Sequence, residues 1–148
     1  KRKVNYCYCI KELNIGKYKL DFLNTKVYDN ENDNSNVIYT EFNGYKFMFM
    51  GDAGVEKEKD ILDKYNISDI DVLKVGHHGS KTSSSKGFID EIKPKYAIIS
   101  VGKNNRYGHP NKEVLNNLDN SKIYRTDQDG SIMFKIKNNK LKIETCSP

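Results

Sequence analysis

Two adjacent histidines, His77 and His78, are the residues best suited to chemistry, because they directly follow an apolar run over residues 72–75. That run predicts a strand, and a strand that ends in His-His-Gly-Ser carries both imidazoles to the rim of a sheet. Neutral imidazole nitrogen binds zinc and other transition metals, and it also transfers protons near neutral pH. The chain holds only three histidines. Two of them side by side at a strand end favour metal binding or catalysis over a purely structural role.

Asp52 is the second candidate ligand, and it follows another apolar run over residues 45–50. Gly51 and Gly54 permit tight backbone turns around it, and a carboxylate can bridge two divalent ions. The alternative interpretation is that Asp52 caps a helix predicted over residues 56–65.

The two histidines are adjacent, and neighbouring residues on an extended chain point to opposite sides. We therefore expect one of His77 and His78 to bind metal, and the other to contact substrate or orient a ligand.

Two polar loops add further candidates. Residues 79–85 begin with Gly79 and Ser80 and offer backbone N–H groups, hydroxyls and Lys81, a composition suited to cradling a phosphate. The alternative there is a flexible polar loop. In residues 104–110, His109 stands beside a turn and is a candidate general acid that protonates a leaving group. The alternative for His109 is a loop that leads into a helix starting near Pro110.

These residues must be positioned by strands that alternate with helices. Strands are predicted over residues 6–10, 18–23, 37–42, 45–50, 72–75, 96–101, 123–125, 132–136 and 141–145, and helices over 56–65, 88–92 and 111–118. Asn43-Gly44 predicts a hairpin turn, and the apolar run before Asp52 predicts a strand buried on both faces. The alternation indicates an α/β fold with antiparallel hairpins at its start and end. The loops after Met50, Val75, Val101 and Arg125, the last carrying Asp127, are then expected to meet at one edge.

Composition sets limits on the class of protein. The 148 residues predict a single domain over residues 1–148, with 36% hydrophobic and 30% charged residues. The chain has no apolar run near the ~20 residues of a membrane span, and the basic start is not followed by the apolar region of a signal peptide. The net charge of +5 fits an anionic partner such as nucleic acid, although scattered lysines also fit a solvated surface.

The three cysteines, Cys7, Cys9 and Cys146, are an odd number and predict free thiols rather than a disulfide framework. A zinc site at Cys7 and Cys9 would need two further ligands that the sequence does not indicate. A catalytic zinc usually takes three protein ligands and keeps one open position. With Asp52 and one or two histidines as donors, the chain looks like half of a metal site.

The segments that carry these residues resemble a known family. They are NDNS at 32–35, FMGDAG at 49–54, DVLKVGHHGSKTSSS at 71–85, ISVGKNNRYGHP at 99–110 and YRTDQDG at 124–130. Together they resemble the metallo-β-lactamase-like domain at the C-terminus of ComEC-type competence proteins, over roughly residues 30 to 136.

The resemblance implies a fold, a reaction and site residues. The fold is an αββα sandwich of two similar halves, and the reaction is metal-dependent hydrolysis of phosphodiesters, usually with two zinc or manganese ions and a bridging hydroxide. In competence proteins the substrate is the DNA strand that is not transported, which implies a place outside the cytoplasm, although the composition also permits a cytoplasmic one. Asp52 matches the bridging carboxylate, His77-His78 the final histidine ligand, and Asn105 and His109 residues near the substrate.

The chain also departs from the family, because the HxHxDH loop that supplies most ligands is absent and no histidine precedes His77. We therefore predict the C-terminal half of the sandwich, an α/β unit with a mixed sheet and helices on one face, with weak or single metal binding and little activity alone. Ser80, Asn105 and His109 would position substrate or donate a proton. An N-terminal half or a second copy would cover the open sheet face, which predicts self-association. The alternative is a non-catalytic nucleic-acid-binding or assembly domain that keeps the fold without a complete metal site.

Overall fold

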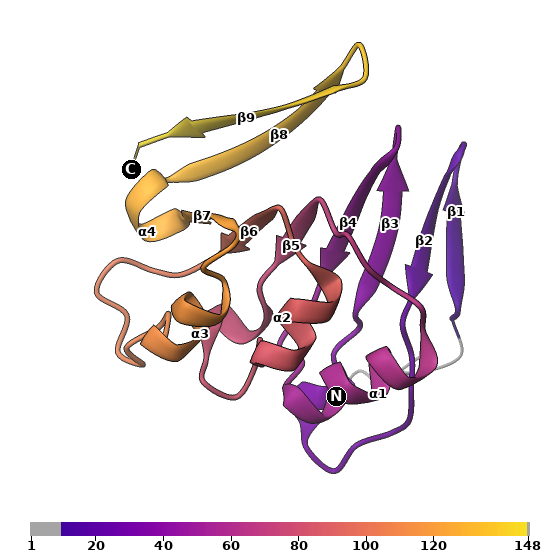
Figure 1. Ribbon diagram of the computed structural model, residues 1–148, viewed down its shortest axis with the longest axis horizontal. Helices are drawn as coiled ribbons and strands as arrows, with labels where there is room; N and C mark the ends of the chain where they lie inside the picture. The colour runs from indigo at the N-terminus through magenta and orange to yellow at the C-terminus, as the bar shows by residue number, and fades with distance from the viewer. Residues whose placement is uncertain (1–9, 148) are drawn as a thin grey trace, which may run out of the picture.

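The computed structural model describes residues 10–147 (Figure 1). Its elements are β1 Glu12–Ile15, β2 Tyr18–Phe22, the 3₁₀ helix η1 Glu31–Asn34, β3 Ile38–Phe42, β4 Tyr45–Phe49, α1 Val55–Lys64, β5 Val72–Lys74, the 3₁₀ helix η2 Gly76–Gly79, α2 Lys86–Ile92, β6 Tyr96–Ile99, α3 Lys112–Asn117, β7 Lys122–Arg125, α4 Thr126–Asp129, β8 Ser131–Lys137 and β9 Lys140–Cys146. The strand predicted over residues 6–10 lies outside the described residues except for residue 10. Cys7 and Cys9 lie outside them as well. The first described strand, β1, lies after that prediction.

Within residues 10–147 a seven-stranded sheet runs in sequence order from β1 to β7. Strands β1 to β4 pair antiparallel, and β4 to β7 pair parallel. The predicted hairpin between β3 and β4 is confirmed, since Asn43 and Gly44 both take positive φ angles of 47° and 83°. Because β4 to β7 are parallel, the segments that follow them all leave the sheet at the same edge.

Helices α1, α2 and α3 cover one face of this sheet (Figure 1). The alternation of each strand decides which side chains meet them: Met48, Leu73 and Ile99 are buried toward the helices. Ile61, Phe88 and other apolar residues of the helices complete this core. The predicted α/β fold, with a mixed sheet and helices on one face, is confirmed.

The hairpin of β8 and β9 packs against the opposite face of the sheet. Phe134 of β8 meets Phe47 of β4 edge to face, with ring centroids 6.2 Å apart. A groove of about 540 Å³ remains between hairpin and sheet, lined by Tyr18, Phe42, Asn43, Phe47, Phe49, Val72, Lys74, Ile98, Ile132, Phe134 and Ile136. Phe49 is 41% exposed in it. The prediction that residues 45–50 are buried on both faces is therefore wrong at Phe49, because the hairpin covers only part of this face.

The polar segment before β3 is shaped by η1, whose N-cap Asn30 accepts a hydrogen bond from the backbone N–H of Asn32. In the part of the chain that the structure describes, no helix has the length and apolar character needed to cross a bilayer. Cys146, at the end of β9, is exposed and forms no disulfide within residues 10–147.

Candidate functional site

The two histidines lie in the turn η2 directly after β5, and their backbone is unusual. His77 and His78 have φ/ψ angles of 45°/44° and 56°/19°, the left-handed region that non-glycine residues avoid. Such residues cost roughly 1–3 kcal/mol each and persist only where surrounding contacts hold them, often at functional sites. One such contact is the hydrogen bond from the His77 N–H to the Gly51 carbonyl, at 3.0 Å. The predicted extended chain, with the two imidazoles on opposite sides, is wrong, because the chain coils at this point.

His78 is oriented toward Asp52. Its Nδ1 lies 2.6 Å from the Ser100 carbonyl oxygen, which can only accept, so the neutral ring carries its proton on Nδ1. The lone pair is then on Nε2, which lies 3.9 Å from Oδ1 of Asp52. Both side chains are about half exposed. A metal-binding histidine usually donates one ring N–H to a group such as a backbone carbonyl, which leaves the other nitrogen for the ion, and His78 has this arrangement.

His77 differs from His78 in that one of its ring nitrogens is buried. This atom, Nδ1, has no hydrogen-bond partner among the described residues. A buried polar atom without a partner costs about 1–3 kcal/mol, so it points to a group that completes it when bound. The His77 ring centroid lies 6.1 Å from that of His109 and 6.4 Å from that of His78. The three imidazoles, from two different loops, therefore form one cluster at the strand ends.

Asp52 is held in place by the segment around η1. Ser35 Oγ accepts a hydrogen bond from the Asp52 N–H at 3.0 Å. Asp33, only 4% exposed, accepts one from the Gly54 N–H at 2.7 Å and one from the Asn30 side chain at 3.0 Å. The sequence places Asp33 and Ser35 in a segment that resembles the family, but it gives no sign that they support Asp52.

Close packing explains the glycines on either side of Asp52. Gly51 has a φ of +59°, and a Cβ there would fall 2.9 Å from the Cβ of Ser35. At Gly54 a Cβ would fall 2.9 Å from the Thr82 carbonyl oxygen and 3.0 Å from Asp33 Oδ1. The N-cap of α1 is Gly54, so the alternative interpretation of Asp52 as a helix cap is wrong.

Asn105 supports His109 through the backbone. Its side-chain amide donates to the His109 carbonyl at 2.7 Å and accepts from the His109 N–H at 2.9 Å. Burial lowers the pKa of the His109 imidazole, and the nearby His77 and His78 lower it further. This lowered pKa favours the neutral ring at pH 7. The structure thus places Asn105 as a support of the loop and His109 as a member of the imidazole cluster.

Ser80 and its loop form an internal support. Ser80 is 6% exposed, and its hydroxyl pairs with that of Thr82 at 3.0 Å. Ser83 donates to the Gly76 carbonyl at 2.9 Å, beneath the histidine turn. The backbone N–H groups of Ser84 and Ser85, just before α2, donate to the buried carboxylate of Glu58. The predicted phosphate cradle is wrong at these donors, because Glu58 already occupies the place of an anion.

Asp127 also serves the fold. Its carboxylate forms two hydrogen bonds with the Arg125 guanidinium, at 3.0 and 2.6 Å, and this pairing lowers the pKa of Asp127. Next to it, the Thr126 hydroxyl accepts from the Val101 N–H and donates to the Val101 carbonyl, both at 2.8 Å. These bonds fix the end of β6, from which the loop with His109 departs.

The donors present fit a metal ion in kind, but they are few. In residues 10–147 no three His, Cys, Asp or Glu side chains are grouped so that they could hold an ion. His78 and Asp52 offer two donors, and a catalytic zinc usually takes three from the protein. Any complete metal centre therefore needs ligands beyond those that this part of the chain brings together.

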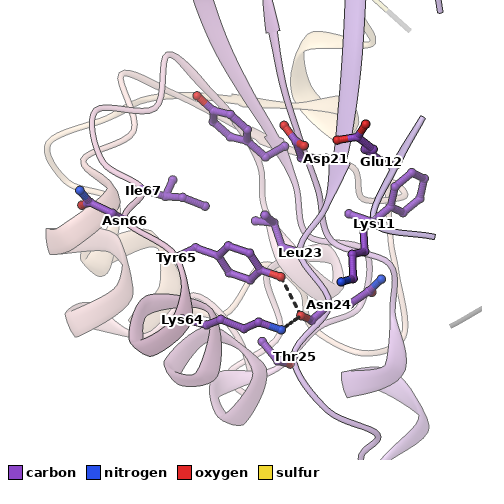
Figure 2. Close-up of a pocket in the computed structure, with 12 residues that line it drawn as sticks. Lys11, Glu12, Asp21, Leu23, Asn24, Thr25, Lys64, Tyr65, Asn66 and Ile67 are labelled. Atoms are coloured by element: carbon purple, nitrogen blue, oxygen red, sulfur yellow. Dashed lines mark hydrogen bonds between the residues drawn. The ribbon is translucent and has the colours of Figure 1, made fainter. Parts of the chain in front are cut away.

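A separate hollow of about 660 Å³ lies on the β1 side of the sheet, beside β2 and the end of α1 (Figure 2). Lys64 and Tyr65 reach across it and donate to the Asn24 carbonyl at 2.6 and 2.7 Å. None of the six predicted site residues lines this hollow. Its size alone does not make it the reactive site, since the imidazoles and Asp52 lie elsewhere.

The similarity of this chain to known proteins is confined to short segments of much longer proteins. No family model matches the chain. ComE operon protein 3 of Bacillus subtilis is 44% identical over 110 residues, which is 73% of this chain and 14% of that protein. Competence protein ComA of Neisseria gonorrhoeae is 36% identical over 108 residues, covering 70% of this chain and 16% of that protein. Recombination protein 2 of Haemophilus influenzae is 32% identical over 116 residues, covering 77% and 14%. The chain is thus similar to a segment of proteins named for competence and recombination, and it spans about one sixth or less of their length.

Proposed function

We propose that this chain is the C-terminal part of a metal-dependent hydrolase of phosphodiesters, with DNA as its substrate in bacterial competence. The observation that carries the proposal is the pair of His78 Nε2 and Asp52 Oδ1, 3.9 Å apart, beside the unpartnered Nδ1 of His77. The similarity to a protein named for competence supports the biological setting, that is DNA uptake. The family that the sequence resembles supports the reaction.

Each residue has a role in this proposal. Asp52 and His78 would hold zinc or manganese, and His77 would complete the ligand set or contact the substrate. A bound ion of this kind activates water and neutralises charge on a phosphodiester. His109 would position the phosphodiester or transfer a proton, with Asn105 fixing its loop. Ser80 would act through the turn that it builds, since its hydroxyl is paired with Thr82.

The first test is metal binding by the purified chain. We expect zinc or manganese to bind weakly. His78→Ala removes an imidazole donor, and Asp52→Asn replaces the anionic carboxylate with a neutral amide whose oxygen is a weaker ligand, so each should lower the affinity at least about 10-fold. Isothermal titration measures this directly. The control is Asp90→Asn, which removes an exposed carboxylate that pairs with Lys86 far from the imidazole cluster. Equal affinity in the wild type and both site variants would rule the proposed metal ligands out.

A second function is favoured by a different observation, the exposed cations and Tyr107 in the loop before His109. These residues suit a nucleic-acid-binding module that retains the fold without the chemistry. DNA binding that survives both a chelator and the combined His77→Ala and His78→Ala substitutions, together with no metal uptake, would select this function over the hydrolase.

The open face of the sheet suggests how the isolated chain behaves. The groove between the sheet and the β8–β9 hairpin is lined mostly by aromatic and aliphatic side chains. Exposed apolar patches of this kind mark interaction sites. The two relatives ComE operon protein 3 and competence protein ComA are far longer than this chain, and in them further segments could cover the corresponding face. We propose that a second copy of the chain covers it in solution when the 148 residues are alone.

Phe49→Glu tests that proposal. We expect the wild-type chain to self-associate and the variant to be monomeric, because a carboxylate on this face would be desolvated in the contact. Size-exclusion chromatography with light scattering gives the mass. Val27→Glu is the matched control, since Val27 is 70% exposed in the segment between β2 and η1 and lies outside the groove. A wild-type chain that elutes as a monodisperse monomer would contradict the proposal.

A further inference from the structure

Tyr107 is the most exposed of the large hydrophobic residues in the part of the chain that the structure describes, with 79% of its surface accessible to solvent. Its ring lies nearly parallel to that of His109, with a centroid distance of 5.8 Å and an interplanar angle of 19°. At this distance the two rings are not in full face-to-face contact, so the phenol lies beside an imidazole of the cluster and is only partly covered by it. The rest of the ring, including the other face, is open to solvent.

The loop that carries Tyr107 is anchored on both sides. The Asn105 side chain bonds both backbone groups of His109, and the Asn111 N–H donates to the Gly79 carbonyl at 2.8 Å. The contact with the histidine turn is tight, because a Cβ on Gly79 would fall 2.7 Å from the Cβ of Pro110. The backbone that carries Tyr107 is thus held in place beside the imidazole cluster, so this loop needs little ordering when a ligand binds.

The charged side chains of this loop are all positive. Residues 102–110 contain two exposed cations, Lys103 and Arg106, and no carboxylate. An exposed aromatic face flanked by cations is how proteins bind single-stranded nucleic acid: the ring stacks on a base, and the cations neutralise phosphates. A small phosphodiester without a base would gain nothing from the open face of Tyr107.

We propose that Tyr107 is a base-stacking platform that gives this site a preference for single-stranded nucleic acid. An unpaired base stacks on the outer face of Tyr107, and the strand then runs along Lys103 and Arg106 toward the imidazole cluster. Bases in a duplex are already stacked on their neighbours and cannot take this place. The inference rests on the proposed function only for the direction of the strand toward Asp52 and His78, because the stacking itself requires no metal.

The experiment measures binding by fluorescence anisotropy in the presence of a chelator. The probes are a labelled oligothymidine, an oligonucleotide of the same length with abasic sugars, and a duplex of the same length. We expect the wild-type chain to bind oligothymidine roughly 5- to 150-fold more tightly than the abasic strand, which corresponds to about 1–3 kcal/mol for one stacked base. Tyr107→Ala should remove most of that preference, whereas Tyr107→Phe should keep it because the ring remains.

Three results would each overturn the proposal. They are an equal preference in the wild type and Tyr107→Ala, a duplex bound as tightly as oligothymidine, and a wild-type chain that binds none of the probes. Because the chelator removes metal, a failure in this assay leaves the metal titrations of Asp52→Asn and His78→Ala unaffected. Conversely, the metal titrations could rule out Asp52 and His78 as ligands while the preference for oligothymidine persists. Tyr107 would then belong to a nucleic-acid-binding domain without the metal chemistry.

Discussion

Replacing Glu58 with alanine is expected to lower the free energy of unfolding by about 3–5 kcal/mol, as much as the loss of a large apolar side chain from the core. Glu58 is 1% exposed, and its carboxylate accepts hydrogen bonds from the backbone N–H groups of Ser84 and Ser85. Alanine would leave both donors buried without partners, at a cost of about 1–3 kcal/mol each, and would open a cavity. Urea denaturation followed by circular dichroism measures the change.

The matched control lies in the first turn of the same helix. Glu56 pairs with Lys26 at 2.8 Å, but both side chains are more than half exposed. Such surface pairs contribute about 0–1 kcal/mol, so Glu56→Ala should change the unfolding free energy by less than about 1 kcal/mol. A similar small change for Glu58→Ala would contradict the role of Glu58 as the buried partner of the loop before α2.

Glu58 should also make the stability depend on pH. Burial raises the pKa of Glu58 above its ordinary value of 4.5, although the hydrogen bonds from Ser84 and Ser85 oppose that shift. The folded chain therefore holds this proton at pH values where the unfolded chain has lost it. It follows that the part of the stability that comes from holding this proton is fully present below about pH 4.5 and is lost as the pH rises through the raised pKa, whereas the hydrogen bonds from Ser84 and Ser85 remain.

Glu58→Gln separates this titration from the packing. Glutamine cannot ionise, so only the wild type should lose this proton-linked stability as the pH rises from about 4.5 toward neutrality. The unfolding free energy of the wild type minus that of the variant should therefore decrease over this range. Other carboxylates titrate in the same range, but their contributions cancel in that difference. A difference that stays constant across this range would show that Glu58 titrates normally in the fold.

Much of the fold could be predicted because local patterns determine it. The turn at Asn43-Gly44, the helices α1 to α3 and the parallel strands β5 and β6 all follow from short-range propensity and periodicity. The convergence of Asp52, His78 and His109 could be predicted as well, since parallel strands place their following loops at one edge. Those features need no knowledge of distant contacts.

The errors arise where residues far apart in sequence decide the outcome. The left-handed turn at His77 and His78 is held by contacts such as that with Gly51, and a strand pattern gives no sign of it. Glu58 and Asp33 look like surface acids in the sequence. They are buried because backbone donors 21 to 27 residues away need acceptors. Ser80 and Asn105 stay candidates for the site, and their hydrogen bonds within their own loops could not be read from the sequence pattern.

Asp33→Ala is expected to have the second largest effect, with consequences for both stability and the metal site. The change removes the acceptor of the buried Gly54 N–H and of the Asn30 side chain, which should lower the unfolding free energy by about 2–4 kcal/mol. It should also free the loop that holds Asp52, and loss of such a support typically weakens metal binding about 10- to 100-fold. Urea denaturation and zinc titration of the same preparations measure the two effects.

Two milder substitutions divide the effect into its parts. Asp33→Asn keeps one oxygen for the Gly54 N–H, so most of the metal affinity should remain, while its amide loses the bond from Asn30. Ser35→Ala removes only the acceptor of the Asp52 N–H, at the rim of the site, and should cost about 1 kcal/mol. If Asp33→Ala binds zinc as tightly as the wild type at a temperature where both are folded, Asp33 does not position Asp52. Its buried carboxylate would then serve only to join η1 to the start of α1.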